Sequence, residues 1–419
     1  MKYNLSIYNI YFQTGEDLLI YNSLSNKYIM IEKCNINKLK ELKNSIELNK
    51  SDLFLSGFIT NNNSNVEQKL CDEVYFSYLN NNTLSITLIT TRACNFRCQY
   101  CPQEHNNQFM SEDIYNRVTK FIIKNITNYN KIKITLFGGE PTLSIDYFLP
   151  FLDKINEICK YYKRKFEGVM ISNGYLLTAQ IIKELYKHNI TQYQITLDGS
   201  VSNHNKNRPY LDNSETFDTI YNNLLYILDD KKLSRISVAI RINCTKELLD
   251  SIDDWYRFYE PFINDNRFLL NLGVVQDRGG KYIKSFNDIL ISETDDIYFL
   301  AKKKLSLHDF YENYMKNNYF ICKDISYNSY TIDFDGRLRS CSNIYTDNIV
   351  GYLSENGNPI ISINEKLQYL KTEQKCFKCP VEPLCHGKSC KIHFKCEKDS
   401  IINTIKNNAD YSNIRKIKI

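Results

Sequence analysis

Three closely spaced cysteines are the residues of this chain best suited to metal or redox chemistry. Cys94, Cys98 and Cys101 lie in the run TTRACNFRCQYCPQ, directly after the apolar stretch SITLIT. They supply three thiolates, one fewer than the four that close a structural metal site. A 4Fe–4S cluster held by three cysteines keeps one iron free for a ligand that is not protein. Taken alone, these three cysteines also fit half of a zinc site, so the choice between a zinc site and an iron–sulfur cluster depends on the motifs that follow.

Two glycine-containing motifs follow, each after an apolar stretch that is typical of a strand. The run LFGGEPT contains Gly138, Gly139 and Glu140. Its glycines let a ligand approach the backbone, and its carboxylate can accept hydrogen bonds from a cationic amine. The run SNG contains Ser172 and Asn173, whose hydroxyl and amide suit the hydroxyls of a ribose.

In this order and spacing, the motifs resemble those of radical S-adenosylmethionine (SAM) enzymes. Tyr100, an aromatic residue just before the third cysteine, belongs to the same signature. The resemblance implies that the free iron chelates the amino and carboxylate groups of SAM. It implies that the reduced cluster cleaves SAM to methionine and a 5′-deoxyadenosyl radical. The implied SAM contacts are Tyr100 near adenine, Gly138, Gly139 and Glu140 at the ammonium, and Ser172 and Asn173 at the ribose.

The stretch ITLDGSVSNHNKNRP extends this resemblance. There Thr196 takes the place of a ribose-contacting residue, and Arg208 takes that of a guanidinium paired with the SAM carboxylate. A planar, two-pronged donor suits a carboxylate physically. Asp198 and His204 are expected to shape this loop and not to take part in chemistry.

Seven more cysteines near the end of the chain form a second pattern. They are Cys322, Cys341, Cys376, Cys379, Cys385, Cys390 and Cys396. The pattern resembles the SPASM extension of radical SAM enzymes, which holds two auxiliary iron–sulfur clusters. It departs from that extension by one extra residue before Cys390 and a short gap to Cys396. Tetrahedral zinc is the alternative, because paired cysteines suit it as well.

The resemblance assigns these cysteines to an outer and an inner cluster. The outer cluster would be held by Cys376, Cys379, Cys385 and Cys396, and the inner one by Cys322, Cys341 and Cys390. Three cysteines at the inner cluster leave an iron for a substrate thiolate, unless His386 or His393 closes the site. Together with the SAM-binding cluster, we expect three 4Fe–4S clusters.

The elements that must position these residues alternate regularly between strands and helices. Strands are predicted at 85–90, 132–137, 168–172, 192–197, 236–243 and 268–275, with helices between them. One predicted helix begins after Ser111 as N-cap, and another begins after Thr178. Such a series implies a parallel sheet with helical crossovers, whose ligands bind at the carboxyl ends of the strands. The motifs above occur at such ends, and a partial (β/α)6 barrel is also the fold of the radical SAM family.

Three domains are predicted. Residues 1–82 form a small α+β domain, winged-helix-like in layout, that would recognise a peptide leader by adding it to a sheet edge. Residues 83–305 form the radical SAM core. Residues 306–419 form the SPASM domain, which has little periodicity and is expected to depend on bound metal for its stability.

Bulk composition narrows the class of protein. The chain has 419 residues, 43% hydrophobic and 24% charged, with a net charge of +5. This charge is too small and dispersed to indicate nucleic acid as a partner. No stretch approaches the roughly 20 apolar residues that span a bilayer, and the start of the sequence lacks a signal-peptide pattern. With 14 cysteines mostly at metal-ligand spacings, a cytoplasmic protein with reduced thiolates is predicted.

The predicted activity is radical modification of a ribosomally made precursor peptide, with reducing equivalents from a flavodoxin or ferredoxin. A thioether crosslink is the expected product because of the three-cysteine inner cluster, while carbon–carbon crosslinking and epimerisation stay open. An anaerobic sulfatase-maturating, formylglycine-forming enzyme is an alternative that LDGSVSNHNKNR fits. Against it, that type has little sequence before its first cysteines and an acid where this chain has Ser342. A non-catalytic iron–sulfur scaffold or leader-binding protein is the other class considered.

Overall fold

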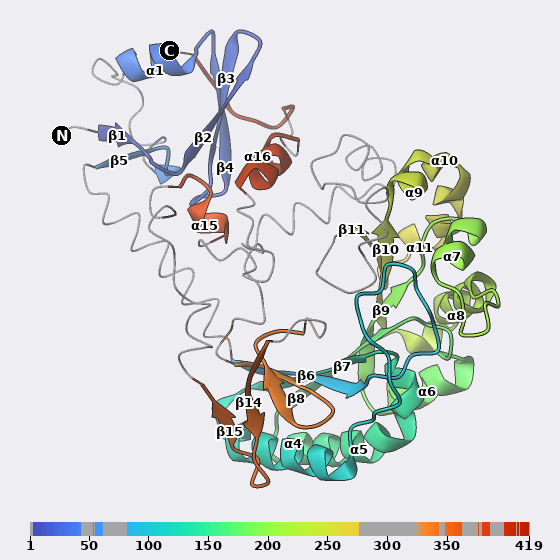
Figure 1. The fold of residues 1–419 in the computed structure, drawn as a ribbon. Helices are drawn as coiled ribbons and strands as arrows, with labels where there is room; N and C mark the ends of the chain where they lie inside the picture. Colours follow the sequence, from blue (N-terminus) through green and yellow to red (C-terminus); the bar gives the residue numbers. More distant parts are fainter. Residues whose placement is uncertain are drawn as a thin grey trace. The chain divides into compact units, whose positions relative to one another are not determined.

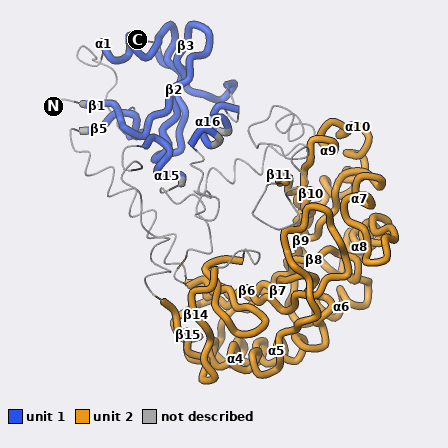
Figure 2. The backbone as a smooth tube through the Cα atoms, viewed as in Figure 1, with its two compact units in different colours: residues 1–80, 306–323, 368–419 blue, residues 81–305, 324–367 orange. Residues whose placement is uncertain are grey.

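The structure is a computed structural model in which the chain divides into two compact units. The larger unit covers residues 81–305 and 324–367, and the smaller one covers residues 1–80, 306–323 and 368–419 (Figure 2). Within these ranges the described residues are 3–42, 53, 55–61, 82–275, 326, 328–342, 348–362, 376, 379–385, 398–407, 409 and 411–418.

The larger unit is built on a ten-stranded sheet (Figure 1). Its strands are β6 (Thr83–Thr91), β7 (Lys131–Gly138), β8 (Lys165–Ser172), β9 (Ile190–Thr196), β10 (Ser237–Cys244), β11 (Phe268–Val274), β12 (Ser329–Ile332), β13 (Arg337–Arg339), β14 (Ile349–Leu353) and β15 (Pro359–Ile361). The first six run parallel in chain order, which confirms the predicted α/β class and large parallel sheet. β12 adds in parallel to the outer edge of β6, and β13 to β15 continue the sheet in antiparallel fashion.

Helices connect the parallel strands and lie along the outer side of the curved sheet (Figure 1). The longer ones are α4 (Glu112–Asn125), α5 (Ile145–Tyr161), α6 (Ala179–Lys187), α7 (Val201–Asn207) and α8 (Phe217–Asp229). Shorter elements are η1 (Ile126–Asn128), η2 (Pro141–Ser144), η3 (Lys231–Leu233), α9 (Lys246–Asp250), α10 (Ile252–Trp255), η4 (Tyr256–Tyr259) and α11 (Glu260–Ile263).

The predicted helix starts are confirmed by their caps. The Ser111 hydroxyl accepts a hydrogen bond from the Ile114 amide, and the Thr178 hydroxyl accepts one from the Ile181 amide, each at 3.4 Å. Such bonds satisfy amides that have no partner within the helix. The spacing of the apolar residues in the first of these helices, α4, predicts one inward face, and its members Ile114, Val118, Phe121 and Ile122 are all buried. Sequence periodicity therefore identified the face that packs inward.

A buried charge cluster joins β12 and β13 to the chain just before the first cysteines. Asp333 is fully buried, and its Oδ2 atom accepts hydrogen bonds from Arg92 Nη2 at 2.6 Å and Arg339 Nε at 2.7 Å. Arg339 also donates to the side chain of Asn348 at 2.8 Å. Because Arg92 lies two residues before Cys94, this cluster fixes the start of the cysteine loop against the added strands.

The smaller unit contains a four-stranded sheet. A meander of β2 (Asn9–Thr14), β3 (Asp17–Asn22) and β4 (Lys27–Glu32) is extended by β16 (Lys416–Lys418), which pairs in parallel with β4. β1 (Tyr3–Leu5) and β5 (Ile59–Asn61) form a separate pair. The unit's helices are α1 (Ile36–Leu42), α15 (Glu382–Cys385) and α16 (Lys398–Asn407).

Both faces of this sheet are covered by apolar side chains of other segments. In β3, Leu18 and Ile20 pack in a cluster with Leu39 of α1. Leu19 and Tyr21 face the other way and pack with α15 and α16 through a second cluster that includes Leu384, Ile401 and Ile405. The second face is covered by segments far away in the sequence, and local alternation carries no information about them.

The three predicted domains do not coincide one to one with the two units of the structure. The predicted boundaries at 82 and 305 lie close to changes between the units, whereas residues after 305 are divided between both. The winged-helix-like and SPASM identities of the first and last domains stay predictions. Within the described part of the chain, no helix has the length and apolar composition needed to cross a membrane.

Candidate active site

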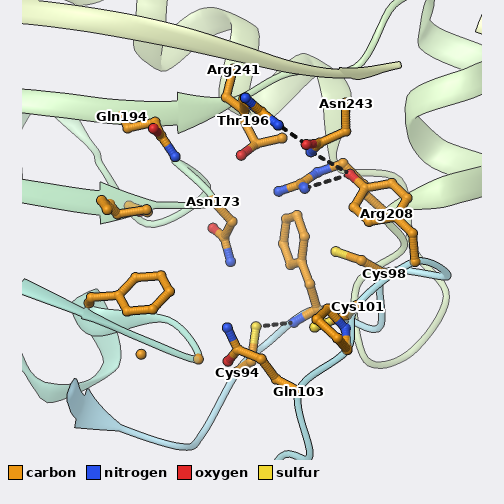
Figure 3. A pocket seen from close by; sticks show the side chains of 18 of the residues that line it. Cys94, Cys98, Cys101, Gln103, Asn173, Gln194, Thr196, Arg208, Arg241 and Asn243 are labelled. Carbon is orange, nitrogen blue, oxygen red and sulfur yellow. Dashed lines mark hydrogen bonds between the residues drawn. The ribbon is translucent and has the colours of Figure 1, made fainter. Parts of the chain in front are cut away.

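A cavity of about 440 Å³ lies between the cysteine loop and the carboxyl ends of the parallel strands. Figure 3 shows the cysteines on one side of it and polar side chains of β9 and β10 on the other. The residues that line it are Cys94, Phe96, Cys98, Tyr100, Cys101, Pro102, Gln103, His105, Phe137, Gly138, Gly139, Ile171, Ser172, Asn173, Gln194, Thr196, Arg208, Arg241, Asn243 and Val275. The structure thus brings together all of the residues that the sequence predicted for this site except Glu140.

The three cysteines converge on this cavity from the loop that follows β6. Burial raises the pKa of each thiol, and for Cys101 the value reaches about 12. The loop is fixed from outside, because the Arg97 amide donates to the Pro209 carbonyl at 2.9 Å and the Gln99 amide donates to the Asn207 carbonyl at 2.8 Å. Buried thiolates need a compensating positive charge, which bound iron supplies. The donor set therefore fits an iron–sulfur cluster.

Among the described residues, no three His, Cys, Asp or Glu side chains lie close enough together to hold a single metal ion. A four-iron cluster makes a different demand on its ligands, because each cysteine thiolate binds a different iron. Cys94, Cys98 and Cys101 are suited to bind three different irons of one cluster, because all three line the same cavity.

The Gly-Gly-Glu segment packs directly on the backbone before Cys94. The Gly139 amide donates to the Thr91 carbonyl at 2.9 Å, and the Glu140 amide donates to the Ala93 carbonyl at 2.8 Å. A Cβ atom on Gly139 would lie 2.1 Å from the Ala93 oxygen, which is closer than any real contact. Glycine is required here because the end of β7 and the cysteine loop touch through their backbones.

Glu140 lies behind the cavity wall and not in it. Its fully buried carboxylate accepts hydrogen bonds from the amide and hydroxyl of Thr142 at 3.0 and 2.7 Å. It also accepts one from the Ser172 hydroxyl at 2.8 Å and one from the Asn173 amide at 2.7 Å. Burial raises the pKa of the carboxyl group, and these bonds oppose that rise. Glu140 thereby orients Ser172 and Asn173, while the SAM contact expected of it stays a prediction.

Replacement of Glu140 tests this supporting role. Glu140→Gln replaces one acceptor oxygen by an NH2 group, which then faces donors such as the Asn173 amide. We expect about tenfold weaker SAM binding, the effect of losing buried hydrogen bonds worth about 1–2 kcal/mol. Equilibrium dialysis of anaerobically reconstituted protein measures this affinity. Glu167→Gln is the control, because Glu167 pairs with Lys131 and Lys133 elsewhere on the sheet; equal SAM affinity in wild type and Glu140→Gln would contradict the role.

Tyr100 and Arg208 belong to one hydrogen-bonded network. The Tyr100 hydroxyl donates to the Asp198 carboxylate and accepts hydrogen bonds from Arg208 Nη1 at 2.9 Å and Asn243 Nδ2 at 3.1 Å. Burial lowers the pKa of Arg208, but Cys98, Tyr100 and Asp198 raise it more, so the guanidinium stays charged. Its Nε atom is buried without a partner among the described residues. That free donor suits the carboxylate of a ligand.

Asp198 and His204 shape the loop after β9, as the sequence predicted. The Asp198 carboxylate accepts a hydrogen bond from the Asn243 amide at 2.7 Å, in addition to the one from Tyr100. The Asp198 amide donates to His204 Nδ1 at 3.0 Å, and burial lowers the pKa of that imidazole far below its ordinary value. His204 is therefore neutral, and neither side chain lines the cavity.

Sequence reasoning missed several residues of this wall. Gln194, Arg241 and Asn243 line the cavity from β9 and β10, and Gln103 and His105 line it from the cysteine loop. The alternation of side chains along a strand is the sequence signal that points to them. Gln194 and Thr196 occupy one face of β9 near its carboxyl end, and Arg241 and Asn243 occupy one face of β10 in the same way. Polar residues at alternate positions of an otherwise buried strand indicate a lumen that holds a ligand.

The cysteines predicted for auxiliary clusters are only partly described. Cys341 lies in the larger unit just after β13, where its sulfur accepts a hydrogen bond from Asn348 Nδ2 at 3.1 Å. Cys376, Cys379 and Cys385 lie in the smaller unit, the last at the end of α15. Cys322, Cys390 and Cys396, with His386 and His393, lie outside the described residues. The cluster assignments of these cysteines stay predictions.

Comparison with known proteins supports the class that fold and site define. Residues 88–243 match the family model described as Radical SAM superfamily. The chain therefore contains a radical SAM domain, and proteins of this superfamily bind a 4Fe–4S cluster and SAM.

Curated relatives match this part of the chain. One is the radical SAM cyclopropyl synthase TigE of Paramaledivibacter caminithermalis, 27% identical over 203 residues, which covers 38% of this chain and 42% of the relative. Another is a GTP 3′,8-cyclase of Aliarcobacter butzleri, 30% identical over 164 residues, which covers 37% of this chain and 44% of the relative. The chain thus spans less than half the length of either relative.

Solved structures with the same fold cover more of the chain. Native anSMEcpe with bound AdoMet has a TM-score of 0.55 at 18% identity, and the match covers 77% of this chain and 96% of that one. Streptococcus suis SuiB bound to precursor peptide SuiA has a TM-score of 0.50 at 13% identity, and the match covers 93% and 96%. At these identities the likeness establishes the fold alone.

Proposed function

We propose that this protein is a radical SAM enzyme that modifies a ribosomally made precursor peptide. The observation that carries the proposal is the convergence of Cys94, Cys98 and Cys101 on a cavity that also holds Arg208. A SAM-ligated 4Fe–4S cluster would supply reductive cleavage of SAM and a carbon radical able to abstract hydrogen.

The chain's own residues would bind and orient SAM in this cavity. Arg208 holds a fixed positive charge beside Cys98, with Tyr100 and Asp198 setting its position. Gly138 and Gly139 let the end of β7 pack against the backbone of the cysteine loop at the cavity wall, and Ser172 and Asn173 present polar groups oriented by Glu140. Thr196 lines the same cavity from β9, the strand next to β8. Together these groups match the acidic, cationic and hydroxyl-bearing parts of SAM.

Two features support a peptide as the substrate. The solved structures with this fold include SuiB bound to precursor peptide SuiA and anSMEcpe bound to the Cp18Cys peptide. The smaller unit contains an antiparallel meander, β2 to β4, of the kind that accepts an extended segment at its edge. Strand β16 already occupies the β4 edge, so an extended segment would add beside β2 or beside β16, the outer strands of this described sheet.

A thioether crosslink is the product we propose. It joins a cysteine sulfur to a carbon with net loss of two hydrogen atoms, and it rests on an inner cluster held by Cys322, Cys341 and Cys390. Formylglycine formation is the second candidate, favoured by the likeness to anSMEcpe. Against that candidate, Ser342 follows Cys341 and provides no carboxylate base. Carbon–carbon crosslinking and epimerisation are the remaining outcomes of the same radical chemistry.

The test begins with protein purified and reconstituted without oxygen. Reduced protein with SAM should release 5′-deoxyadenosine, and no release with any reductant would favour an iron–sulfur scaffold. About twelve irons per chain are expected, whereas about four would reject the two auxiliary clusters.

Co-expression with a short cysteine-containing peptide encoded beside the gene then defines the product. Mass spectrometry should show loss of two hydrogen atoms together with loss of thiol alkylation. Unchanged mass would point to epimerisation. Loss of the cysteine sulfur would point to formylglycine.

A further inference from the structure

A second guanidinium lines the cavity, and none of the predicted SAM contacts includes it. Arg241 of β10 pairs in register with Thr196 of β9 on one side and with Asn271 of β11 on the other. Its partly buried side chain belongs to the cavity wall. Figure 3 shows it on the side of the cavity opposite Cys94.

Neutral groups hold this guanidinium in place. Arg241 Nε donates to Asn243 Oδ1 and Nη1 donates to Asn271 Oδ1, each at 3.1 Å. Space for it comes from Gly273, where a Cβ atom would lie 1.7 Å from Arg241 Nη2. The two amide oxygens orient the guanidinium without neutralising it, since amides carry no net charge.

Arg241 differs in this respect from Arg208, the other arginine of the cavity. Arg208 shares Tyr100 with the Asp198 carboxylate, and Cys98 lies close enough to raise its pKa. Arg241 forms no ion pair with any carboxylate of the described residues. Burial raises the pKa of Asp198, and the charge of Arg241 opposes that rise. The Asp198 carboxylate, however, already accepts hydrogen bonds from the Tyr100 hydroxyl and the Asn243 amide. Arg241 is thus a positioned cation whose remaining N–H groups are available to a ligand.

We propose that Arg241 binds a carboxylate of the substrate, which makes an acidic group close to the modified residue part of what this enzyme recognises. The inference rests on the proposed function. A guanidinium held by two bonds presents its other donors in a fixed plane, and this geometry matches a carboxylate. SAM also carries a carboxylate, but its expected position at the cluster places that group near Cys98 and Arg208. The carboxylate that reaches Arg241 therefore comes from the second reactant.

The test uses two capped synthetic peptides that differ only in glutamate or glutamine beside a cysteine. Binding is measured by calorimetry on reconstituted protein with SAM bound. Wild type is expected to bind the glutamate peptide about tenfold more tightly, the effect of one charge-assisted pair. Arg241→Gln should lose this preference and keep its SAM affinity. Gly273→Ala should lose it too, because the added methyl displaces the guanidinium without removing its charge.

Controls separate this inference from the function on which it rests. Arg235→Gln removes an exposed arginine that stacks on Tyr186 outside the cavity, and it should keep the glutamate preference. A wild type that does not distinguish the peptides, or a preference that survives Arg241→Gln, overturns the inference. If Arg241→Gln loses as much affinity for SAM as for the glutamate peptide, the arginine binds SAM, and this result also overturns the inference. Release of 5′-deoxyadenosine from the same samples reports on the proposed function independently.

Discussion

Cys98→Ala is expected to abolish reductive cleavage of SAM. The variant removes one of the three thiols that line the cavity, and the two that remain cannot hold a site-differentiated four-iron cluster. Release of 5′-deoxyadenosine should fall by on the order of 10⁴-fold, as it does when a group essential to the reaction is lost. Chromatographic assay of 5′-deoxyadenosine, with iron analysis of the same samples, measures both effects.

Cys159→Ala is the matched control for this prediction. Cys159 is also buried, but it lies on α5 away from the cavity. Its replacement should leave iron content and SAM cleavage at wild-type levels. If Cys98→Ala kept its activity, or if both variants lost it equally, the cavity would not be the site of SAM cleavage.

Asp333→Asn is expected to produce the largest loss of stability. The carboxylate is fully buried and pairs with both Arg92 and Arg339, so the neutral amide removes a negative charge that two buried guanidinium groups share. Breaking a buried ion pair from one side costs about 3–5 kcal/mol. In a domain of this size, the thermal midpoint should fall by on the order of 10 °C. Calorimetry or circular dichroism under nitrogen measures this shift.

Asp335→Asn provides the comparison two residues away. Asp335 pairs with Arg337 at the surface, where ion pairs contribute no more than about 1 kcal/mol. Its thermal midpoint should match that of wild type. Equal midpoints for the two variants would show that the Arg92–Asp333–Arg339 cluster does not stabilise the larger unit. Because Arg92 starts the cysteine loop, lower iron content is also expected in Asp333→Asn.

The sequence predicted the central sheet well because local patterns determine it. Apolar runs marked the six consecutive parallel strands β6 to β11, and Ser111 and Thr178 marked helix starts that the caps confirm. Long-range pairing was not predictable in this way. β12 adds to β6 from more than 200 residues away in the sequence, and β16 adds to β4 from more than 350 residues away; periodicity contains no information about such partners.

The residues of the candidate site also fall into two groups, those that a local motif predicts and those whose role depends on long-range folding. Residues in compact motifs, such as Cys94, Gly139 and Arg208, were recognised because their spacing is short and specific. Arg241 and Asn243 were missed because each is a single polar residue in an ordinary strand. Their importance arises only when the sheet curves and brings β10 opposite the cysteine loop (Figure 3). The sequence predicts Glu140 as a SAM contact, whereas the four hydrogen bonds that it accepts behind the cavity wall are visible only in the structure.

The electron paramagnetic resonance spectrum of the reduced, anaerobically reconstituted protein, recorded with and without SAM, is the most direct test of this account. If SAM binds at an iron left free by Cys94, Cys98 and Cys101, adding it must change the signal of that cluster. Such a change is expected in wild type and in Cys159→Ala, and none is expected in Cys98→Ala. A wild-type spectrum that stays the same at saturating SAM would contradict it.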